Sequence, residues 1–402
     1  MANLPYGVFS AAERPPRAGV RIGDSVLDLL PVLGEQAFAE PSLNAFMAQG
    51  RARWTDVRAR ITELLTESRH RAVVEAALHP LSGVRLHRPF EVGDYVDFYA
   101  SENHAANVGR LFRPGSEPLM PNWKHLPVGY HGRSGTVVLS GTPVSRPNGQ
   151  RPGGQRPGGQ RPGEDAPTFG PSQRLDFEAE VGFVVGVGSS PGSPVGVGAF
   201  ADHVFGAFLV NDWSARDIQA WESRPLGPFL AKSFATSISP WIVPLEALAH
   251  AQVRPPPQDP EPLPYLAGGE HWGLDLALEV RLNGQVVSCP PFATMYWTPA
   301  QMLAHMTVNG ASTRTGDFFA SGTVSGPARE ERGCLLELSW GGAEPLELPD
   351  GSERSFLEDG DEVTISATAP AADGRRIGFG EVTGRVLRAR LASDVITGAA
   401  DH

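Results

Sequence analysis

The chain has 402 residues, of which 41% are hydrophobic and 20% are charged, so it can bury a sizeable core and is long enough for two or three domains. Its formal net charge of −11 argues against a nucleic-acid-binding surface and against an anionic membrane partner. The charge does not exclude an acidic substrate, because a local cationic pocket can lie inside an acidic protein. The 46 Gly and 37 Pro favour a mainly β architecture with many turns.

The patterns that concern membrane spans, signal peptides and cysteine usage predict a cytoplasmic protein. No apolar run approaches membrane-spanning length, and the first residues lack the basic and apolar regions of a signal peptide. The two cysteines, Cys289 and Cys334, are far apart and have no metal-ligand spacing. A reducing compartment and a protein without a disulfide framework are therefore expected.

Residues 1–88 are predicted to form a small separate module. Residues 20–30 suggest a hairpin that turns at Gly23-Asp24. Between residues 42 and 66, apolar side chains recur on one face of a helix, with Ser42 as a plausible N-cap and Gly50 as a possible break. The apolar positions are Trp54, Val57, Ile61, Leu64 and Leu65.

From residue 89 onward the pattern changes to strands broken by Gly and Pro. The clearest strand candidates are residues 175–186, 207–210, 274–282, 362–367 and 378–387. Asn283-Gly284 is a hairpin signal. One helix is expected between Thr298, as N-cap before Pro299, and Asn309-Gly310.

Residues 146–163 form a low-complexity insertion. The pentapeptide RPGGQ occurs at 151–155 and again at 156–160. Because Arg-Pro pairs and Gly dominate, this segment is predicted to be a flexible or polyproline-like surface loop without a core. Use of the loop as a basic tether for an acidic partner is the weaker alternative.

The strand candidate around residue 180 carries two carboxylates on one face. Strand side chains alternate, so Glu178 and Glu180 share a side while Phe177, Ala179 and Val181 share the other. A solvent-facing strand explains this pattern. A cation between the two carboxylates also explains it, since buried like charges otherwise repel.

Two more acids favour the cation. Asp212 follows an apolar strand, and Asp97 lies among aromatic residues, on the same face as Tyr99 if the segment is extended. Together with Glu178 and Glu180 these acids could build an oxygen-ligand site for Mg²⁺ or Ca²⁺. No Cys or paired His accompanies them, which disfavours zinc and copper.

Candidates for a base and for a catalytic cation are less specific. His104 lies in a polar stretch, and His125, His131 and His203 compete with it as a general base. Lys232 and Lys124 are the only lysines among 34 basic residues. A surface side chain whose stem packs on Phe229 and Phe234 is one interpretation of Lys232, but the rarity of lysine in this chain suggests a site that needs a compact ammonium.

Several long strings carry a resemblance to a known family. They are NLPYGVFS at residues 3–10, GDYVDFY at 93–99, PNW at 121–123, LPVGYHGR at 126–133, NDWSARDIQ at 211–219, PLGPFLAKSF at 225–234 and ASGTVSGP at 320–327. With them the chain resembles the two-domain form of the fumarylacetoacetate hydrolase family from residue 3 to about 388. The resemblance implies an SH3-like N-terminal barrel at 1–88, a mixed β-roll catalytic domain at 89–402, and a homodimer.

The resemblance also implies roles for individual residues. It makes His104 the general base and Glu337 the carboxylate that orients it. The remaining assignments fall into three groups: metal ligands Asp97, Glu178, Glu180 and Asp212, with Lys232 and Thr236 near a second magnesium position; catalytic donors Arg216, Gln219 and Lys232; substrate contacts Tyr99, Arg113, Tyr130, Gln219 and Thr323. Ser223 departs from the family, which often has a substrate-contacting tyrosine there.

The implied activity is metal-dependent hydrolysis of a carbon–carbon bond in a small β-diketo acid, 4-fumarylacetoacetate, giving fumarate and acetoacetate in tyrosine and phenylalanine catabolism. A sister activity, such as acylpyruvate hydrolysis or oxaloacetate decarboxylation, would share the metal site but use a smaller pocket. A non-catalytic, metal-stabilised β binding protein is the alternative from another class. His104, Glu337 and Lys232 argue against it, because a binding module does not need a base.

Overall fold

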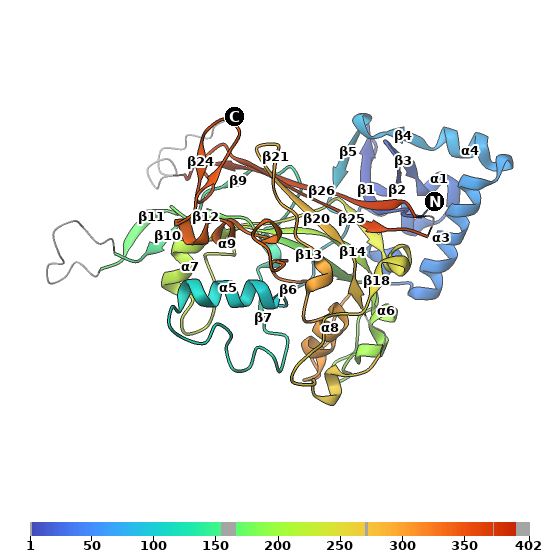
Figure 1. Ribbon diagram of the computed structural model, residues 1–402. Coiled ribbons are helices and arrows are strands. Elements are labelled where there is room, and N and C mark those ends of the chain that lie inside the picture. The colour runs from blue at the N-terminus through green and yellow to red at the C-terminus, as the bar shows by residue number, and fades with distance from the viewer. Residues whose placement is uncertain (1, 154–165, 270–271, 373, 391–402) are drawn as a thin grey trace.

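The computed structural model describes residues 2–153, 166–269, 272–372 and 374–390 and is built mainly from β-strands (Figure 1). A thirteen-stranded sheet runs through it, and a five-stranded sheet lies beside this one. Among the described residues, no helix is long and apolar enough to cross a membrane. The mainly β fold class expected from Gly, Pro and strand patterning is confirmed.

The N-terminal residues form one end of the large sheet, drawn in blue in Figure 1. Its strands follow the order β4-β3-β2-β1, and β5 also pairs with β1. The predicted hairpin is confirmed as β2 and β3, joined at Gly23. The elements are β1 Tyr6–Ala11, β2 Arg17–Ile22, β3 Ser25–Asp28, α1 Leu29–Leu33, α2 Asn44–Met47, α3 Arg51–Thr66, α4 Arg71–Ala76, β4 Leu78–Pro80 and β5 Val84–His87.

The predicted helix between residues 42 and 66 is present as two helices. Gly50 separates α2 from α3, as its position suggested. Leu43, rather than Ser42, is the N-cap of α2, but the Ser42 hydroxyl accepts a hydrogen bond from the Asn44 amide at 3.3 Å. Four of the five predicted core positions on α3 are buried, whereas Leu65 is only partly buried.

The first 88 residues are not held apart from the rest of the chain. β1 pairs with β17 (Trp241–Pro244), so the large sheet continues from one part into the other. Phe205 packs edge-on against Tyr6, Phe46 and Trp54, at centroid distances of 5.4, 5.6 and 5.3 Å. The expected separate module is therefore packed firmly on the larger part.

The centre of the large sheet carries the strands that matter for function. Its order is β17-β14-β13-β22-β6-β7, with β16 pairing with β14 and β8. The strands are β6 Tyr95–Phe98, β7 Gly129–His131, β8 Val137–Leu139, β13 Ala179–Val185, β14 Val204–Asp212, β16 Thr236–Ile238 and β22 Phe318–Ala320. Every residue of β13 and β14 is buried, because one face packs on the main core and the other on the N-terminal core.

The five-stranded sheet has the order β21-β20-β25-β26-β9. Asn283 and Gly284 join β20 to β21 with φ of 50° and 81°, which confirms the predicted hairpin. Its strands are β9 Val144–Ser145, β20 Ala277–Leu282, β21 Gln285–Ser288, β25 Glu362–Pro370 and β26 Arg376–Leu387. Other strands form two-stranded sheets: β12 Leu175–Asp176 with β15 Ser214–Ala215, β18 Gln252–Val253 with β19 Gly273–Leu274, and β23 Leu346–Glu347 with β24 Glu353–Arg354.

Few helices accompany these sheets. The predicted helix after Thr298 is α8, and Thr298 with Gln301 forms a capping box at its start. The helices are α5 Glu102–Phe112, α6 Phe200–His203, α7 Arg216–Glu222, α8 Pro299–Thr307 and α9 Leu335–Leu338. Figure 1 labels both α5 and α7, on the side of the molecule that also carries α9.

The low-complexity insertion is partly ordered, contrary to the prediction of a loop without packing. β10 (Asn148–Arg151) pairs with β11 (Thr168–Pro171), and residues 154–165 lie outside the described part. Gly149 is pressed against Ile218 of α7, where a Cβ would lie 2.6 Å from the Ile218 Cδ1 atom. The hairpin therefore packs on the helix that carries Arg216 and Gln219.

The aromatic contact between the two parts gives a stability test. Phe205→Ala should lower the free energy of unfolding by about 3–5 kcal/mol, because a buried ring is removed and leaves a cavity. Urea denaturation checks this value, with the exposed Leu263→Ala as a matched control that should change it by less than about 0.5 kcal/mol. A normal unfolding free energy for Phe205→Ala would show that the two parts do not depend on this contact.

Candidate active site

Four buried carboxylates meet where the central strands lie side by side. Asp97 is in β6, Glu180 in β13 and Asp212 at the end of β14, while Glu178 bridges to Cys334 just before β13. One carboxylate oxygen of each lies within 4.8 Å of the others. All four residues are at most 4% exposed. The solvent-facing alternative for Glu178 and Glu180 is therefore wrong, because the sheet is covered on both faces.

Part of this carboxylate cluster lacks protein partners. Both Glu180 oxygens and Asp97 Oδ1 are buried without a hydrogen-bond partner among the described residues. Burial, reinforced by the neighbouring carboxylates, raises the pKa of Glu180 and of Asp97 well above the ordinary carboxyl value. Buried oxygens without donors are costly, so a cation bound here would satisfy them. The donor set is the hard-oxygen type that Mg²⁺ and Ca²⁺ prefer.

Lys232 is a buried member of the site and not a surface lysine. Its ammonium contacts a Glu178 oxygen and lies 3.0 Å from Asp212 Oδ2. Burial would lower the Lys232 pKa, but Asp212 and Glu178 outweigh it and raise this pKa above its ordinary value. Burial likewise raises the pKa of Glu178, yet Lys232, Arg216 and His104 outweigh it and hold that pKa below its ordinary range. The lysine thus partly neutralises the cluster.

Arg216 enters the site from the start of α7. Its Nε atom donates to Asp176 Oδ2 at 2.8 Å, one Nη lies 2.8 Å from Glu178 Oε1, and Nη2 has no partner among the described residues. Asp176 is itself held by the amides of Leu335 and Leu336. The guanidinium is therefore fixed in place with one group free for a ligand.

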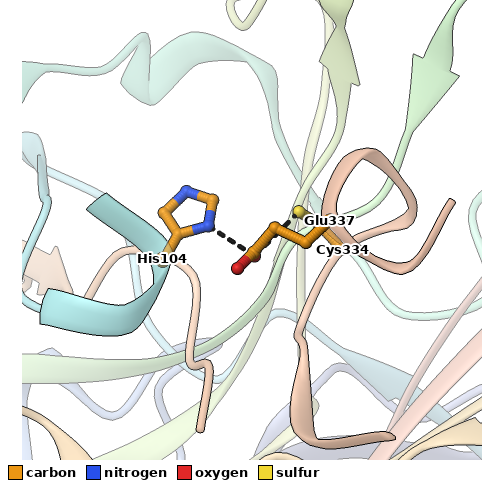
Figure 2. Close-up of side chains that lie close together, drawn as sticks. All are labelled: His104, Cys334 and Glu337. Atoms are coloured by element: carbon orange, nitrogen blue, oxygen red, sulfur yellow. Dashed lines mark hydrogen bonds and ion pairs between the residues drawn. The ribbon is translucent and has the colours of Figure 1, made fainter. Parts of the chain in front are cut away.

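His104 and Glu337 form a buried pair, as the resemblance implied (Figure 2). The His104 Nδ1 atom lies 2.6 Å from Glu337 Oε2, and His104 Nε2 lies 3.9 Å from Glu178 Oε1. His104 is in the first turn of α5, which Ser101 caps by accepting from the His104 amide. The pair thus directs Nε2 toward the carboxylate cluster.

Glu337 is anchored by further donors. Asn107 Nδ2 donates to its Oε1 at 2.9 Å, and the Ser325 hydroxyl and the Cys334 thiol donate to Oε2 at 2.8 and 3.1 Å. Figure 2 shows the thiol beside the carboxylate. Burial raises the Glu337 pKa, but His104 and these hydrogen bonds outweigh it and lower the pKa to about 2. Glu337 is therefore ionised at neutral pH and accepts from Nδ1–H, which leaves Nε2 unprotonated in the neutral ring.

A cavity of about 690 Å³ opens onto these groups. Ten of the predicted site residues line it: Asp97, Tyr99, His104, Arg113, Tyr130, Glu178, Arg216, Gln219, Lys232 and Thr323. Glu180, Asp212 and Glu337 do not line it, but Glu337 bonds to His104, Asp212 pairs with Lys232, and Glu180 belongs to the carboxylate cluster. A larger hollow of about 970 Å³ lies between the N-terminal segment and β26, and none of the carboxylate cluster lines it.

Thr236 lies on the far side of Asp212 from the main cavity. Its hydroxyl donates to Asp212 Oδ1 at 3.1 Å, and Tyr130 donates to Asp212 Oδ2 at 3.0 Å. A small pocket of about 280 Å³ is lined there by Tyr130, Asp212, Lys232 and Thr236. The structure therefore brings Lys232 and Thr236 together next to the carboxylate cluster.

The side chains predicted to contact the substrate differ in whether they already have hydrogen-bond partners within the protein. Tyr130 is engaged with Asp212, and Arg113 Nη2 donates to the Pro118 carbonyl at 2.7 Å. The Thr323 hydroxyl is buried without a partner among the described residues. It is brought to the wall by Gly322, whose φ is +72° and whose Cβ would lie 2.1 Å from the Phe98 carbonyl oxygen, so only glycine fits.

The structure gives the competing histidines different contacts. His104 alone of the four candidates reaches Glu337, whereas His203 Nδ1 is bonded to the Val187 carbonyl and His131 lines the small pocket. Reasoning from sequence missed Asp176, Asn107, Ser325 and Cys334 as partners of the site. Asn107 lies three residues after His104 on the same helical face, which is a usable signal.

Comparison with known proteins finds two family models and full-length relatives that match this chain. Residues 2–89 match the family model described as fumarylacetoacetase N-terminal, and residues 95–387 match fumarylacetoacetate (FAA) hydrolase C-terminal. Fumarylacetoacetase of Homo sapiens is 47% identical, over 97% of this chain and 96% of that protein. The enzymes of Caenorhabditis elegans and Arabidopsis thaliana are 48% and 46% identical, over 97% and 96% of this chain and 96% and 94% of theirs.

Solved structures share the fold. A fumarylacetoacetate hydrolase from Exiguobacterium antarcticum aligns with a TM-score of 0.57 and 17% identity, over 96% of this chain and all of that chain. A maleylpyruvate hydrolase from Sphingobium aligns with a TM-score of 0.50 at 17% identity, with 96% and 100% coverage. At these identities the likeness concerns the fold alone. From the two family models and the full-length relatives, the chain belongs to the fumarylacetoacetase family.

Proposed function

We propose that this enzyme hydrolyses 4-fumarylacetoacetate to fumarate and acetoacetate, the last step of tyrosine and phenylalanine breakdown. The observation that carries the proposal is the His104–Glu337 pair facing the four-carboxylate cluster on one cavity. Full-length relatives named fumarylacetoacetase support the substrate.

The carboxylate cluster is proposed to hold Mg²⁺ or Ca²⁺ through Asp97, Glu178, Glu180 and Asp212, with Lys232 and Thr236 beside a second magnesium position. The unpartnered Glu180 oxygens and the hard-oxygen donor set support this assignment. When bound, the cation supplies Lewis-acid polarisation of the substrate's keto oxygens.

His104 acts as the general base. Its Nε2 atom takes a proton from water, and the oxygen adds to the keto carbon that becomes the fumarate carboxyl group. Glu337 holds the ring in the required tautomer and stabilises the imidazolium that forms. Because both side chains are buried in place before substrate arrives, little reorganisation is needed during the reaction.

Cleavage then breaks the bond between that carbon and the neighbouring methylene. The electron pair moves to the methylene carbon, next to the acetoacetate ketone, and the proton on His104 returns to this carbon. Arg216, Gln219 and Lys232 stabilise the developing oxyanion charge, and Arg216 Nη2 is a buried donor without a hydrogen-bond partner among the described residues. Tyr99, Arg113, Tyr130, Gln219 and Thr323 bind the substrate along the cavity wall.

Assembly and location follow the family resemblance. We infer a cytoplasmic homodimer in which each chain divides at about residue 88, with an SH3-like barrel at 1–88 and a catalytic domain at 89–402. The separate family models for 2–89 and 95–387 support that division.

An absorbance assay of fumarylacetoacetate disappearance, with and without Mg²⁺, tests the proposed function directly. Acylpyruvate hydrolysis and oxaloacetate decarboxylation are assayed in parallel, because they would use the same metal site. Turnover of either one, without turnover of fumarylacetoacetate, would replace the proposed substrate.

Glu180→Gln tests the cation site. The amide keeps the size of the side chain but removes a charged ligand, so the affinity for Mg²⁺ or Ca²⁺ should fall at least about tenfold and activity should be lost. Calorimetric titration measures the affinity without needing turnover. Glu67→Gln, in a surface cluster where Arg69 already pairs with the acid, is the matched control. Wild-type affinity in Glu180→Gln would remove Glu180 from the site.

His104→Ala tests the base. We expect kcat to fall by about 10²–10⁴-fold while cation affinity is retained. His203→Ala, whose ring bonds to a backbone carbonyl away from the cavity, should keep wild-type rates. If His104→Ala does so too, His131 becomes the next candidate.

Lys232→Arg tests the need for a compact ammonium. The charge is kept, but the broad guanidinium must fit a buried site that holds a lysine between two carboxylates, so kcat/KM should fall at least about tenfold. Overpacking should also cost about 1–3 kcal/mol of stability. Lys124→Arg, at the only other lysine, changes a surface pair with Glu102 and should alter neither quantity. Unchanged kinetics for Lys232→Arg would end its catalytic assignment.

A further inference from the structure

A short loop after α7 forms part of the cavity wall. Residues 223–228 all line the cavity, beginning with Ser223 and Arg224. The loop is anchored by Glu222, whose Oε1 accepts from the Phe229 and Ala231 amides at 3.0 and 2.7 Å. The Gly227 amide also donates to the Ser223 carbonyl at 2.7 Å. Arg224 is therefore presented from a held backbone.

Arg224 differs from the other cations on this wall. Arg216 and Lys232 are each paired with buried carboxylates, and the Arg113 guanidinium donates to a backbone carbonyl. The Arg224 side chain is exposed, and no hydrogen bond or ion pair joins it to any residue that the structure describes. Its positive charge and its planar set of donors are free for a ligand.

The neighbouring residue makes room for this ligand. Ser223 lines the cavity next to Arg224, and its short side chain leaves space beside the guanidinium. A guanidinium can bind a carboxylate there through two parallel hydrogen bonds.

We propose that Arg224 binds one carboxylate of the dianionic substrate and so makes this enzyme prefer β-diketo acids with a carboxylate at each end. The inference rests on the proposed function, since it names a residue that binds a charged group of the proposed substrate. Arg224 lies at the cavity wall and not within the carboxylate cluster, so it contributes to binding and not to bond cleavage.

Arg224→Ala tests the assignment. KM for fumarylacetoacetate should rise about tenfold with kcat within about twofold, the pattern of a lost binding contact, and Arg224→Lys should lie in between. The effect should shrink at high salt, because an exposed charge pair is screened. Arg14→Ala removes one positive charge from the exposed β1–β2 turn, outside the cavity, and should keep the wild-type KM.

Two monocarboxylate analogues, tested as competitive inhibitors, identify the group that is bound. 3,5-Dioxohept-6-enoate lacks only the fumaryl carboxylate, and 4,6-dioxohept-2-enoate lacks only the acetoacetate carboxylate. The Arg224→Ala penalty should persist for one analogue and vanish for the other. An unchanged KM, or an equal penalty for both analogues, would overturn the assignment. Absence of fumarylacetoacetate turnover by the wild-type enzyme would instead contradict the proposed function.

Discussion

The whole site depends on one electrostatic constraint, which is that one oxygen of each of four buried carboxylates lies within 4.8 Å of the others. Like charges at this separation are stable only if cations or protons compensate them. Lys232 and Arg216 supply part of the compensation through Glu178 and Asp212. Both Glu180 oxygens lack a hydrogen-bond partner among the residues that the structure describes. A group with positive charge would satisfy these buried oxygens.

This constraint explains why the acids come from sheet strands. Adjacent strands place side chains at fixed spacing, and the packing on both faces prevents these strands from spreading apart under repulsion. The N-terminal part contributes to this rigidity by covering one face of β13 and β14. Its role in catalysis is indirect, because the described residues before β6 do not line the main cavity.

Much of the fold and part of the site can be predicted from the sequence. Alternation along residues 175–185 predicts that Glu178 and Glu180 share a face, and the hairpin and helix-cap signals at Asn283-Gly284 and Thr298 are local and strong. Whether the carboxylates face solvent or core depends on what covers the sheet, which no local pattern contains. The contact between His104 and Glu337 joins residues 233 positions apart, and only the family resemblance pointed to it.

The low-complexity insertion shows a case in which composition predicts too little structure. Its composition predicts a chain that cannot build a core, yet β10 packs against α7 because an existing partner surface supplies the apolar contact that the segment lacks. Gln150 accepts from the Trp221 indole at 3.1 Å, and the Ser172 hydroxyl after β11 donates to Asp217 at 2.6 Å. These contacts brace the outer side of α7 while its inner side presents Arg216 and Gln219.

The strands and the loops therefore carry different groups of this site. Strand positions carry three members of the carboxylate cluster, Asp97, Glu180 and Asp212, and Glu178 lies just before β13. Helix α7 and the loop after it carry groups that line the cavity, and a loop can change its side chains without moving the sheet. A substitution at the cavity wall can thus change the groups presented there while the charge balance of the buried cluster stays the same.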